Sequence, residues 1–179
     1  MLLAARAQFA TAGFSSAELG LIARDAGVTT GAIYHHFGSK IGLFQAVAEQ
    51  LEGEILMAAA TARNPDPLAR LREGFDMLIE ICAKPDVQRI IFIEAAQVLG
   101  PEAWREIESR YALGALRGVL GTLIEQRAIK PYPADLLARV LLALLREVSA
   151  DVARLRDNEH AMAQTRALVG SVFEGLFGR

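Results

Sequence analysis

The chain has 179 residues, 53% of them hydrophobic and 22% charged, and a formal net charge of -2 at pH 7. This composition supplies a hydrophobic core and excludes an intrinsically disordered chain, and the near-neutral charge excludes nonspecific nucleic-acid binding by the whole surface. The single cysteine, Cys82, excludes a disulfide framework and a cysteine-rich zinc site. No basic segment precedes the first apolar residues, and the densest apolar run (140–145) is too short to span a bilayer, so we expect a cytoplasmic protein with neither signal peptide nor membrane segment.

Apolar residues recur at helical spacing along the whole chain, and no stretch alternates apolar and polar residues for long enough to indicate a strand. The sequence therefore predicts an all-α fold of about nine helices. A change of character after Gly53 predicts one domain over 1–52 and a second over 53–179. In chain order we expect the helices at about residues 2–12, 15–25, 29–37, 39 to the break at 64–67, 66–82, 87–98, 100–129, 134–156 and 158–178.

Several helix boundaries are marked by capping residues. Gly13 is predicted to end the first helix, and "SSAE" (15–18) is interpreted as a capping box that starts the second. Thr29 is predicted to cap the third helix and Ser39 the fourth, and Asp66, followed by proline, is expected to start the fifth.

The second and third helices are joined by the tight turn "AGV" (26–28) and braced by the first, which predicts a helix-turn-helix unit. The second helix of such a unit, here "TTGAIYHHF" (29–37), can lie in the DNA major groove with its N-terminal residues at the base edges. It offers threonine hydroxyls, a glycine that allows close approach, and a tyrosine and two histidines that can donate to phosphate; a lysine follows. The candidate DNA-contacting residues are Thr29, Thr30, Gly31, Tyr34, His35, His36 and Lys40.

The stretch "GLIARDAGVTTGAIYHHFGSKIGLF" (20–44) resembles the DNA-binding signature of the tetracycline-repressor (TetR) family of bacterial regulators. The matching elements are Ile22-Ala23, Ala26-Gly27-Val28, Thr29 to Ala32, Ile33 to Phe37 and Ser39-Lys40. The resemblance implies base reading near Thr29, Thr30 and His35, and phosphate contacts from Tyr34, His36 and Lys40. It also implies that the rest of the chain is a helical domain for ligand binding and dimerisation.

Two features depart from the family pattern. Ala17-Glu18 stands where members usually have a threonine or serine pair, and no basic segment precedes Leu2. Residues 1–52 contain three lysines and arginines against four aspartates and glutamates. Because phosphate contacts gain affinity by releasing counterions, we expect modest DNA affinity, about tenfold weaker for each missing contact.

Metal binding and catalysis are the alternative interpretations of His35 and His36. Adjacent positions of a helix point about 100° apart, and no cysteine or third histidine lies nearby in sequence, so we predict no metal site. The sequence also contains no nucleophile motif and no glycine-rich phosphate loop, so we predict neither an enzyme nor a cofactor.

Aromatic residues in the helices between 66 and 129 are candidate ligand contacts, because the family fold implies a cavity there. Each of them taken alone is more often a core residue. Glu94 is interpreted as part of a solvated or salt-bridged helix face. The candidate ligand-binding residues are Phe75, Phe92, Trp104, Tyr111 and the polar Arg110.

The last two helices are apolar on more than one side, so each must be buried on two sides. We expect the second side to pack against a partner subunit in a four-helix interface with two-fold symmetry. The candidate interface residues are Leu137, Val140, Leu141, Leu144, Val148, Val169, Val172, Phe173 and Leu176.

These observations predict a homodimeric transcriptional repressor. It would bind a palindromic operator in double-stranded DNA and be released by a small, mainly apolar effector, with the fourth helix as a lever. Two alternatives remain open at this stage: a regulator whose helical domain binds a protein partner in place of a small ligand, and an enzyme that retains a vestigial DNA-binding head.

Overall fold

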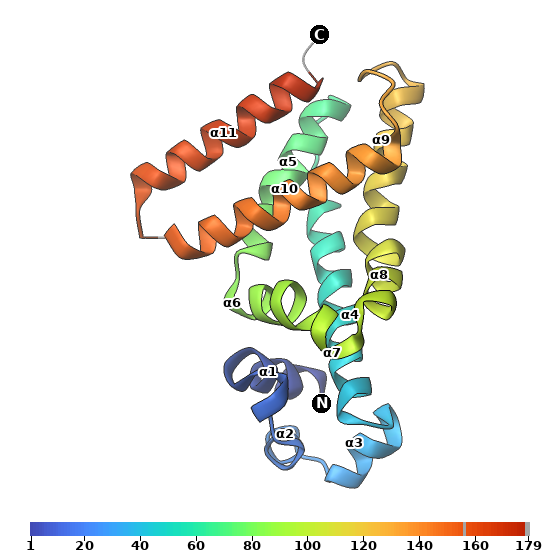
Figure 1. Cartoon of the computed structure of the whole chain (residues 1–179), viewed down its shortest axis with the longest axis vertical. Coiled ribbons are helices and arrows are strands. Elements are labelled where there is room, and N and C mark those ends of the chain that lie inside the picture. Colours follow the sequence, from blue (N-terminus) through green and yellow to red (C-terminus); the bar gives the residue numbers. More distant parts are fainter. Residues whose placement is uncertain (156, 178–179) are drawn as a thin grey trace. The chain divides into compact units, whose positions relative to one another are not determined.

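A computed structural model describes residues 1–155 and 157–177 of the chain (Figure 1). Every regular element in these ranges is helical, which confirms the predicted all-α class, and no helix within them is long and apolar enough to cross a bilayer. The predicted helix ends at Arg156 and Gly178 lie outside the described residues. The chain forms two compact units: the first comprises Met1–Gly53 and Pro85–Ile107, and the second comprises Glu54–Lys84 and the residues from Glu108 onward.

The first unit therefore combines the N-terminal helices with a segment that follows the predicted boundary at residue 52. Within it, α1 packs against α2, α6 and η1, and α2 packs against α3. Its helical elements are α1 (Leu2–Ser16), α2 (Leu19–Asp25), α3 (Thr30–Phe37), the first part of α4 (Lys40–Ala59), α6 (Pro85–Val87), the π-helix η1 (Gln88–Glu94), α7 (Ala95–Leu99) and most of α8 (Pro101–Glu108).

Three phenylalanines join α1 to α4 in the core of this unit. The ring centroids of Phe9 and Phe44 lie 5.1 Å apart in an edge-to-face arrangement, and those of Phe14 and Phe44 lie 5.4 Å apart. Phe9 and Phe44 are fully buried. Such pairs contribute about 0.5–1.5 kcal/mol beyond the burial of apolar area, so this cluster fixes how α1 lies against the start of α4.

The predicted caps of the third, fourth and fifth helices are confirmed. The Thr29 hydroxyl accepts a hydrogen bond from the Ala32 amide at 3.1 Å, and the Ser39 hydroxyl accepts one from the Gly42 amide at 2.9 Å. Asp66 accepts from the amide of Ala69 at 2.8 Å, with Pro67 in the first turn of α5. Each of these bonds satisfies one of the amides that a helix start leaves without an intrahelical partner.

The predicted capping box at residues 15–18 is wrong. Ser15 and Ser16 belong to the last turn of α1, and α2 begins after Glu18, whose side chain makes no capping hydrogen bond. The cause is Gly13, which interrupts α1 with φ 79° and ψ 166° and is followed by one more turn closed by the bond from the Ala17 amide to the Gly13 carbonyl. The chain therefore enters α2 later than the local pattern indicates.

The helices predicted over 87–98 and from 100 are present, but each contains a segment of wider π register. In the first, η1 lies between α6 and α7, and in the second, η2 (Ser109–Leu113) separates α8 from α9 (Gly114–Glu125). A Cβ atom on Gly114 would lie 2.6 Å from the Ser109 carbonyl oxygen, so the missing side chain leaves room for this turn.

The second unit is organised around α10, which packs against α5, α9 and α11 and crosses α5 in Figure 1. Phe75 of α5 contacts Phe173 of α11, with ring centroids 5.0 Å apart, and Cys82 is buried at the end of α5 as a small core residue. The elements of this unit are the end of α4, α5 (Pro67–Cys82), η2, α9, α10 (Ala134–Leu155) and α11 (Glu159–Phe177).

The phenylalanine cluster generates a prediction for stability. Phe44→Ala is expected to lower the free energy of unfolding by about 3–5 kcal/mol, because it removes a fully buried ring and leaves a cavity. Leu3→Ala is the control, since Leu3 lies on the neighbouring helix with 74% of its surface exposed and should change stability by less than about 0.5 kcal/mol. Urea unfolding followed by circular dichroism measures both, and equal losses would contradict the assignment of the core.

Candidate functional site

The turn between α2 and α3 is built by backbone hydrogen bonds. The Ala26 amide donates to the Ile22 carbonyl and the Val28 amide to the Ala23 carbonyl, each at 2.9 Å. Gly27, between them, has φ 66°, in the left-handed region where a glycine avoids the steric cost that a Cβ brings. Ile22 and Ala23 are buried, so the turn is held to the core from one side.

One side of α3 faces the core and the other is open to solvent. Ile33 is fully buried, whereas Tyr34 is 52% exposed and His35 and His36 are exposed with ring centroids 5.5 Å apart. Thr29 and Gly31 are also exposed, and Thr30 is half-buried. The structure thus brings the predicted DNA-contacting residues of α3 onto one accessible helix; their contact with DNA stays a prediction.

Lys40, the remaining candidate for a DNA contact, lies where α1 and α4 meet. Its ammonium donates to the Ser15 carbonyl at 3.2 Å and lies 4.9 Å from the centre of the Phe14 ring. The lysine opens α4, a helix of 20 residues, so its charge stands beside the first-turn amides and the positive dipole end of that helix. This end of the unit thus combines a cation with amide donors, both of which favour an anion.

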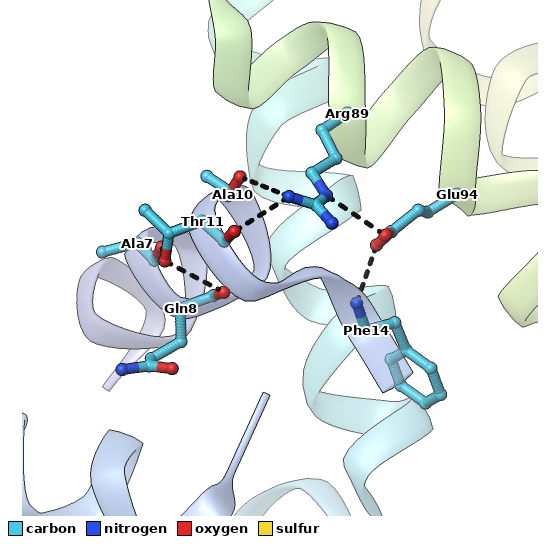
Figure 2. Close-up of polar contacts among 7 residues, drawn as sticks. All are labelled: Ala7, Gln8, Ala10, Thr11, Phe14, Arg89 and Glu94. Carbon is cyan, nitrogen blue, oxygen red and sulfur yellow. Dashed lines mark hydrogen bonds and ion pairs between the residues drawn. The ribbon is translucent and has the colours of Figure 1, made fainter. Parts of the chain in front are cut away.

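An arginine and a glutamate form a second polar cluster against the end of α1, which Figure 2 shows. The Arg89 guanidinium donates to the carbonyl oxygens of Ala10 and Thr11 at 3.3 and 2.9 Å, and to Glu94 at 3.3 Å. The other carboxylate oxygen of Glu94 accepts the Phe14 amide at 2.9 Å. We call Arg89 and Glu94 together the α1 clamp.

The ion pair within the α1 clamp confirms the interpretation of Glu94 as part of a salt-bridged face. Neither the partner of Glu94 nor its role could be predicted from α-helical spacing, since residues five apart do not meet in an α-helix. A second ion pair, between Arg6 and Asp86 at 2.6 Å, joins the beginning of α1 to α6.

The candidate ligand-binding residues do not all belong to one unit. Phe92 and Trp104 lie in the first unit, and Phe75, Arg110 and Tyr111 lie in the second. Phe75 and Trp104 are each 3% exposed, Phe92 and Tyr111 are half-buried, and Arg110 is exposed. Their role in ligand binding stays a prediction.

A groove of about 270 Å³ opens in the second unit between the start of α5 and the end of α11. Apolar side chains make most of its wall, and two acidic residues and an arginine lie among them. It contains Phe173, which the sequence analysis placed in a dimer interface, and none of the candidate ligand-binding residues. Its lining residues are Asp66, Leu68, Ala69, Arg72, Phe173, Glu174 and Phe177.

The candidate interface residues divide into two sets by burial. Leu137, Leu141, Val148, Val169 and Phe173 pack inside the subunit, while Val140, Leu144, Val172 and Leu176 are partly or largely exposed. Two further apolar residues of these helices, Leu136 on α10 and Leu168 on α11, are 52% and 60% exposed. Within the described residues, no three histidine, cysteine, aspartate or glutamate side chains gather as a metal site requires.

Comparison with known proteins places this geometry in a family. The chain matches the family model described as "Bacterial regulatory proteins, tetR family" over residues 1–47, and that described as "Tetracyclin repressor-like, C-terminal domain" over residues 68–176. The HTH-type transcriptional repressor BepR of Brucella suis is 32% identical to it over 156 residues, which are 81% of this chain and 75% of that protein.

Solved structures agree with these matches over nearly the whole chain. A TetR-family transcriptional regulator from Pectobacterium atrosepticum is 26% identical, with a TM-score of 0.73 over 99% of this chain and 92% of that one. The regulator FadR from Bacillus subtilis, solved in complex with stearoyl-CoA, shares the fold at 19% identity, with a TM-score of 0.77 over 99% of this chain and 96% of that one. The exposed α3 on its glycine turn and the matched models over both ends of the chain lead to one conclusion: this protein belongs to the TetR family of DNA-binding transcriptional regulators.

Proposed function

We propose that the protein is a repressor that binds a palindromic operator as a homodimer and leaves it when a small, mainly apolar effector binds. The observation that carries the DNA half of this proposal is the exposed side of α3, where Thr29, Tyr34, His35 and His36 face solvent beside a buried Ile33. Threonine at the helix start suits base edges, and the tyrosine and histidines suit phosphate oxygens.

Dimerisation is supported by apolar surface on α10 and α11 that the subunit leaves uncovered. Leu136 and Val140 are four residues apart on α10 and are 52% and 46% exposed, and Leu168 on α11 is 60% exposed. Exposed apolar residues that continue along two neighbouring helices are typical of an interface between subunits. With two-fold symmetry, the two copies of α3 would enter successive major grooves about 34–36 Å apart.

The effector part of the proposal is a shift between two populations. α4 begins in the first unit and ends in the second, so it is a continuous connection through which an effector can change the spacing of the two copies of α3. An effector can shift this equilibrium only by its difference in affinity for the two states. Stearoyl-CoA in the FadR structure supports a long acyl chain as the first class of effector to test.

The DNA-binding proposal predicts the behaviour of Lys40→Met. Duplexes enriched from random DNA by the wild-type protein should form a palindrome, and the variant should bind them about tenfold more weakly. A plot of log K against log salt between about 50 and 200 mM should be less steep by about 0.9, the value for one phosphate contact. Lys84→Met is the control, because Lys84 is an exposed lysine of the second unit.

The dimer proposal predicts that Val140→Glu and Leu168→Glu both yield monomers, because each places a charge in an apolar interface without a partner. Met57→Glu, at a residue that is 71% exposed on α4, should remain dimeric. Sedimentation velocity at micromolar concentration separates the two states. A monomeric wild-type protein would contradict the proposal.

The effector proposal predicts that one member of an acyl-CoA series of increasing chain length releases the selected duplex. The apparent Kd for DNA should rise about 5- to 150-fold at saturation, the usual range of allosteric coupling. Titration of effector into the labelled protein–duplex complex measures this. A compound that binds the protein while the Kd for DNA stays constant is not the effector, and such a result for the whole series rules out this class.

A further inference from the structure

We infer that Arg89 and Glu94 are positioning residues for operator binding: the α1 clamp holds the end of α1 so that Lys40 is presented to a phosphate. This inference rests on the proposed function. Neither residue lies on α3 or at the start of α4, so their effect on DNA would be exerted through α1 alone.

The π register of η1 brings the two residues of the clamp together. In an α-helix, residues five apart point about 140° away from each other, so an arginine and a glutamate at that spacing diverge. In a π turn the backbone bond joins residues i and i+5, which brings side chains at that spacing to neighbouring positions. Arg89 and Glu94 lie within η1 and form an ion pair at 3.3 Å, and Figure 2 shows both directed at α1. The register therefore creates the clamp.

The clamp binds the backbone on either side of the break in α1. α1 is broken at Gly13, so the carbonyls of Ala10 and Thr11 have lost the amides that a continuing helix would supply, and the Arg89 guanidinium donates to both. Beyond the break, the amide of Phe14 donates to Glu94. The clamp thus satisfies the backbone on both sides of the same break.

Gly13 shows how closely the clamp approaches the backbone. A Cβ atom on this residue would lie 2.5 Å from the Nη2 atom of Arg89 and 2.6 Å from the Oε1 atom of Glu94. Gly13 also has φ 79°, which a residue with a side chain adopts only under strain. The break in α1 and the clamp therefore depend on the same residue. Glycine at position 13 allows the backbone conformation of the break and leaves the space that the Arg89 and Glu94 side chains occupy.

Phe14 and Ser15 connect the clamp to Lys40, the proposed phosphate contact. The Phe14 ring packs against Phe9 and Phe44, and the Lys40 ammonium stands over its face at 4.9 Å. The same ammonium donates to the carbonyl of Ser15, the next residue along the chain. Glu94 binds the Phe14 amide and so places the backbone that carries both groups that hold Lys40, in addition to the packing of the Phe14 ring. Release of that amide would let the lysine move away from its place at the start of α4.

Burial indicates that the clamp is stronger than an ordinary surface ion pair. The Glu94 side chain is 16% exposed and that of Arg89 is 37% exposed, whereas Glu80 and Arg166, an ion pair at 3.0 Å in the second unit, are 59% and 66% exposed. Exposed pairs contribute little, so the second pair is a matched control for the same substitutions.

The experiment compares Glu94→Met, Arg89→Met and their double variant with the controls Glu80→Met and Arg166→Met, all in the 179-residue chain on the duplex selected by the wild type. Both clamp variants should bind the duplex about tenfold more weakly than the wild type and show the shallower salt dependence of Lys40→Met. The double variant should lose no more DNA affinity than the single variant with the larger loss, because the two residues act as one unit. The controls should match the wild type. Hydrogen exchange without DNA should be faster at residues 13–17 in Glu94→Met and Arg89→Met, and unchanged in the two controls.

The salt dependence separates positioning from simple loss of stability. A destabilised variant binds less DNA because fewer molecules are folded, but its folded molecules keep every phosphate contact and hence the wild-type slope. A wild-type slope in the clamp variants, with affinity lowered in proportion to thermal unfolding, would overturn the inference. So would an equal change of slope in Asp86→Asn, which breaks the other ion pair of α1.

The two proposals fail in different ways. If the wild-type protein enriches no duplex, the proposed function is lost, and with it the link from the clamp to DNA. If the wild type selects a palindrome and the clamp variants bind it with wild-type affinity, only the inference is lost. Unchanged hydrogen exchange at residues 13–17 in Glu94→Met overturns the clamp itself, whatever the DNA result.

Discussion

A helix that ends inside a protein leaves carbonyl groups without donors, and the first unit meets this need with an arginine from a distant part of the chain. Arg89 donates to the carbonyls of Ala10 and Thr11, shortly before Gly13, and Glu94 accepts a hydrogen bond from the first amide after Gly13. These bonds join residues about 80 positions apart in the sequence, so they tie α1 to the segment that begins at residue 85. The phenylalanine cluster beneath them and the turn that leads into α2 both depend on where α1 stops.

Electrostatics makes this placement more important than it would be in a strongly basic protein. With three cations against four anions, residues 1–52 cannot rely on overall charge to approach DNA. In the proposed function, the attraction would come from a few donors at fixed positions, supplemented by the dipole end of α4. Under the proposed function, a small displacement of one lysine would remove a large share of the available interaction, so the packing around Phe14 and Ser15 would affect operator binding.

Features that depend on neighbouring residues could be predicted from the sequence, and features that depend on distant ones could not. Thr29 and Ser39 cap helices through amides three residues away, so their pattern is sufficient. The serines at 15–18 match a capping pattern equally well, but Gly13 and its distant clamp decide the outcome. The exposed side of α3 follows from helical spacing, whereas the π register of η1 leaves no trace in apolar spacing. Likewise, Leu137 and Val140 are equally apolar, and only packing shows that the first is buried within the subunit and the second is exposed.

Gly13 also limits how this chain can change in evolution. Any side chain at that position meets the guanidinium and the carboxylate at once and requires a strained backbone, so substitution there has to be accompanied by movement of both clamp side chains and a change of the backbone. Conversely, a lineage that loses Arg89 or Glu94 is freed from the need for glycine and can let α1 run on as a continuous helix. Positions 13, 89 and 94 should therefore be inherited as a set and replaced together, and their pattern among relatives would record which regulators kept the broken helix and which abandoned it.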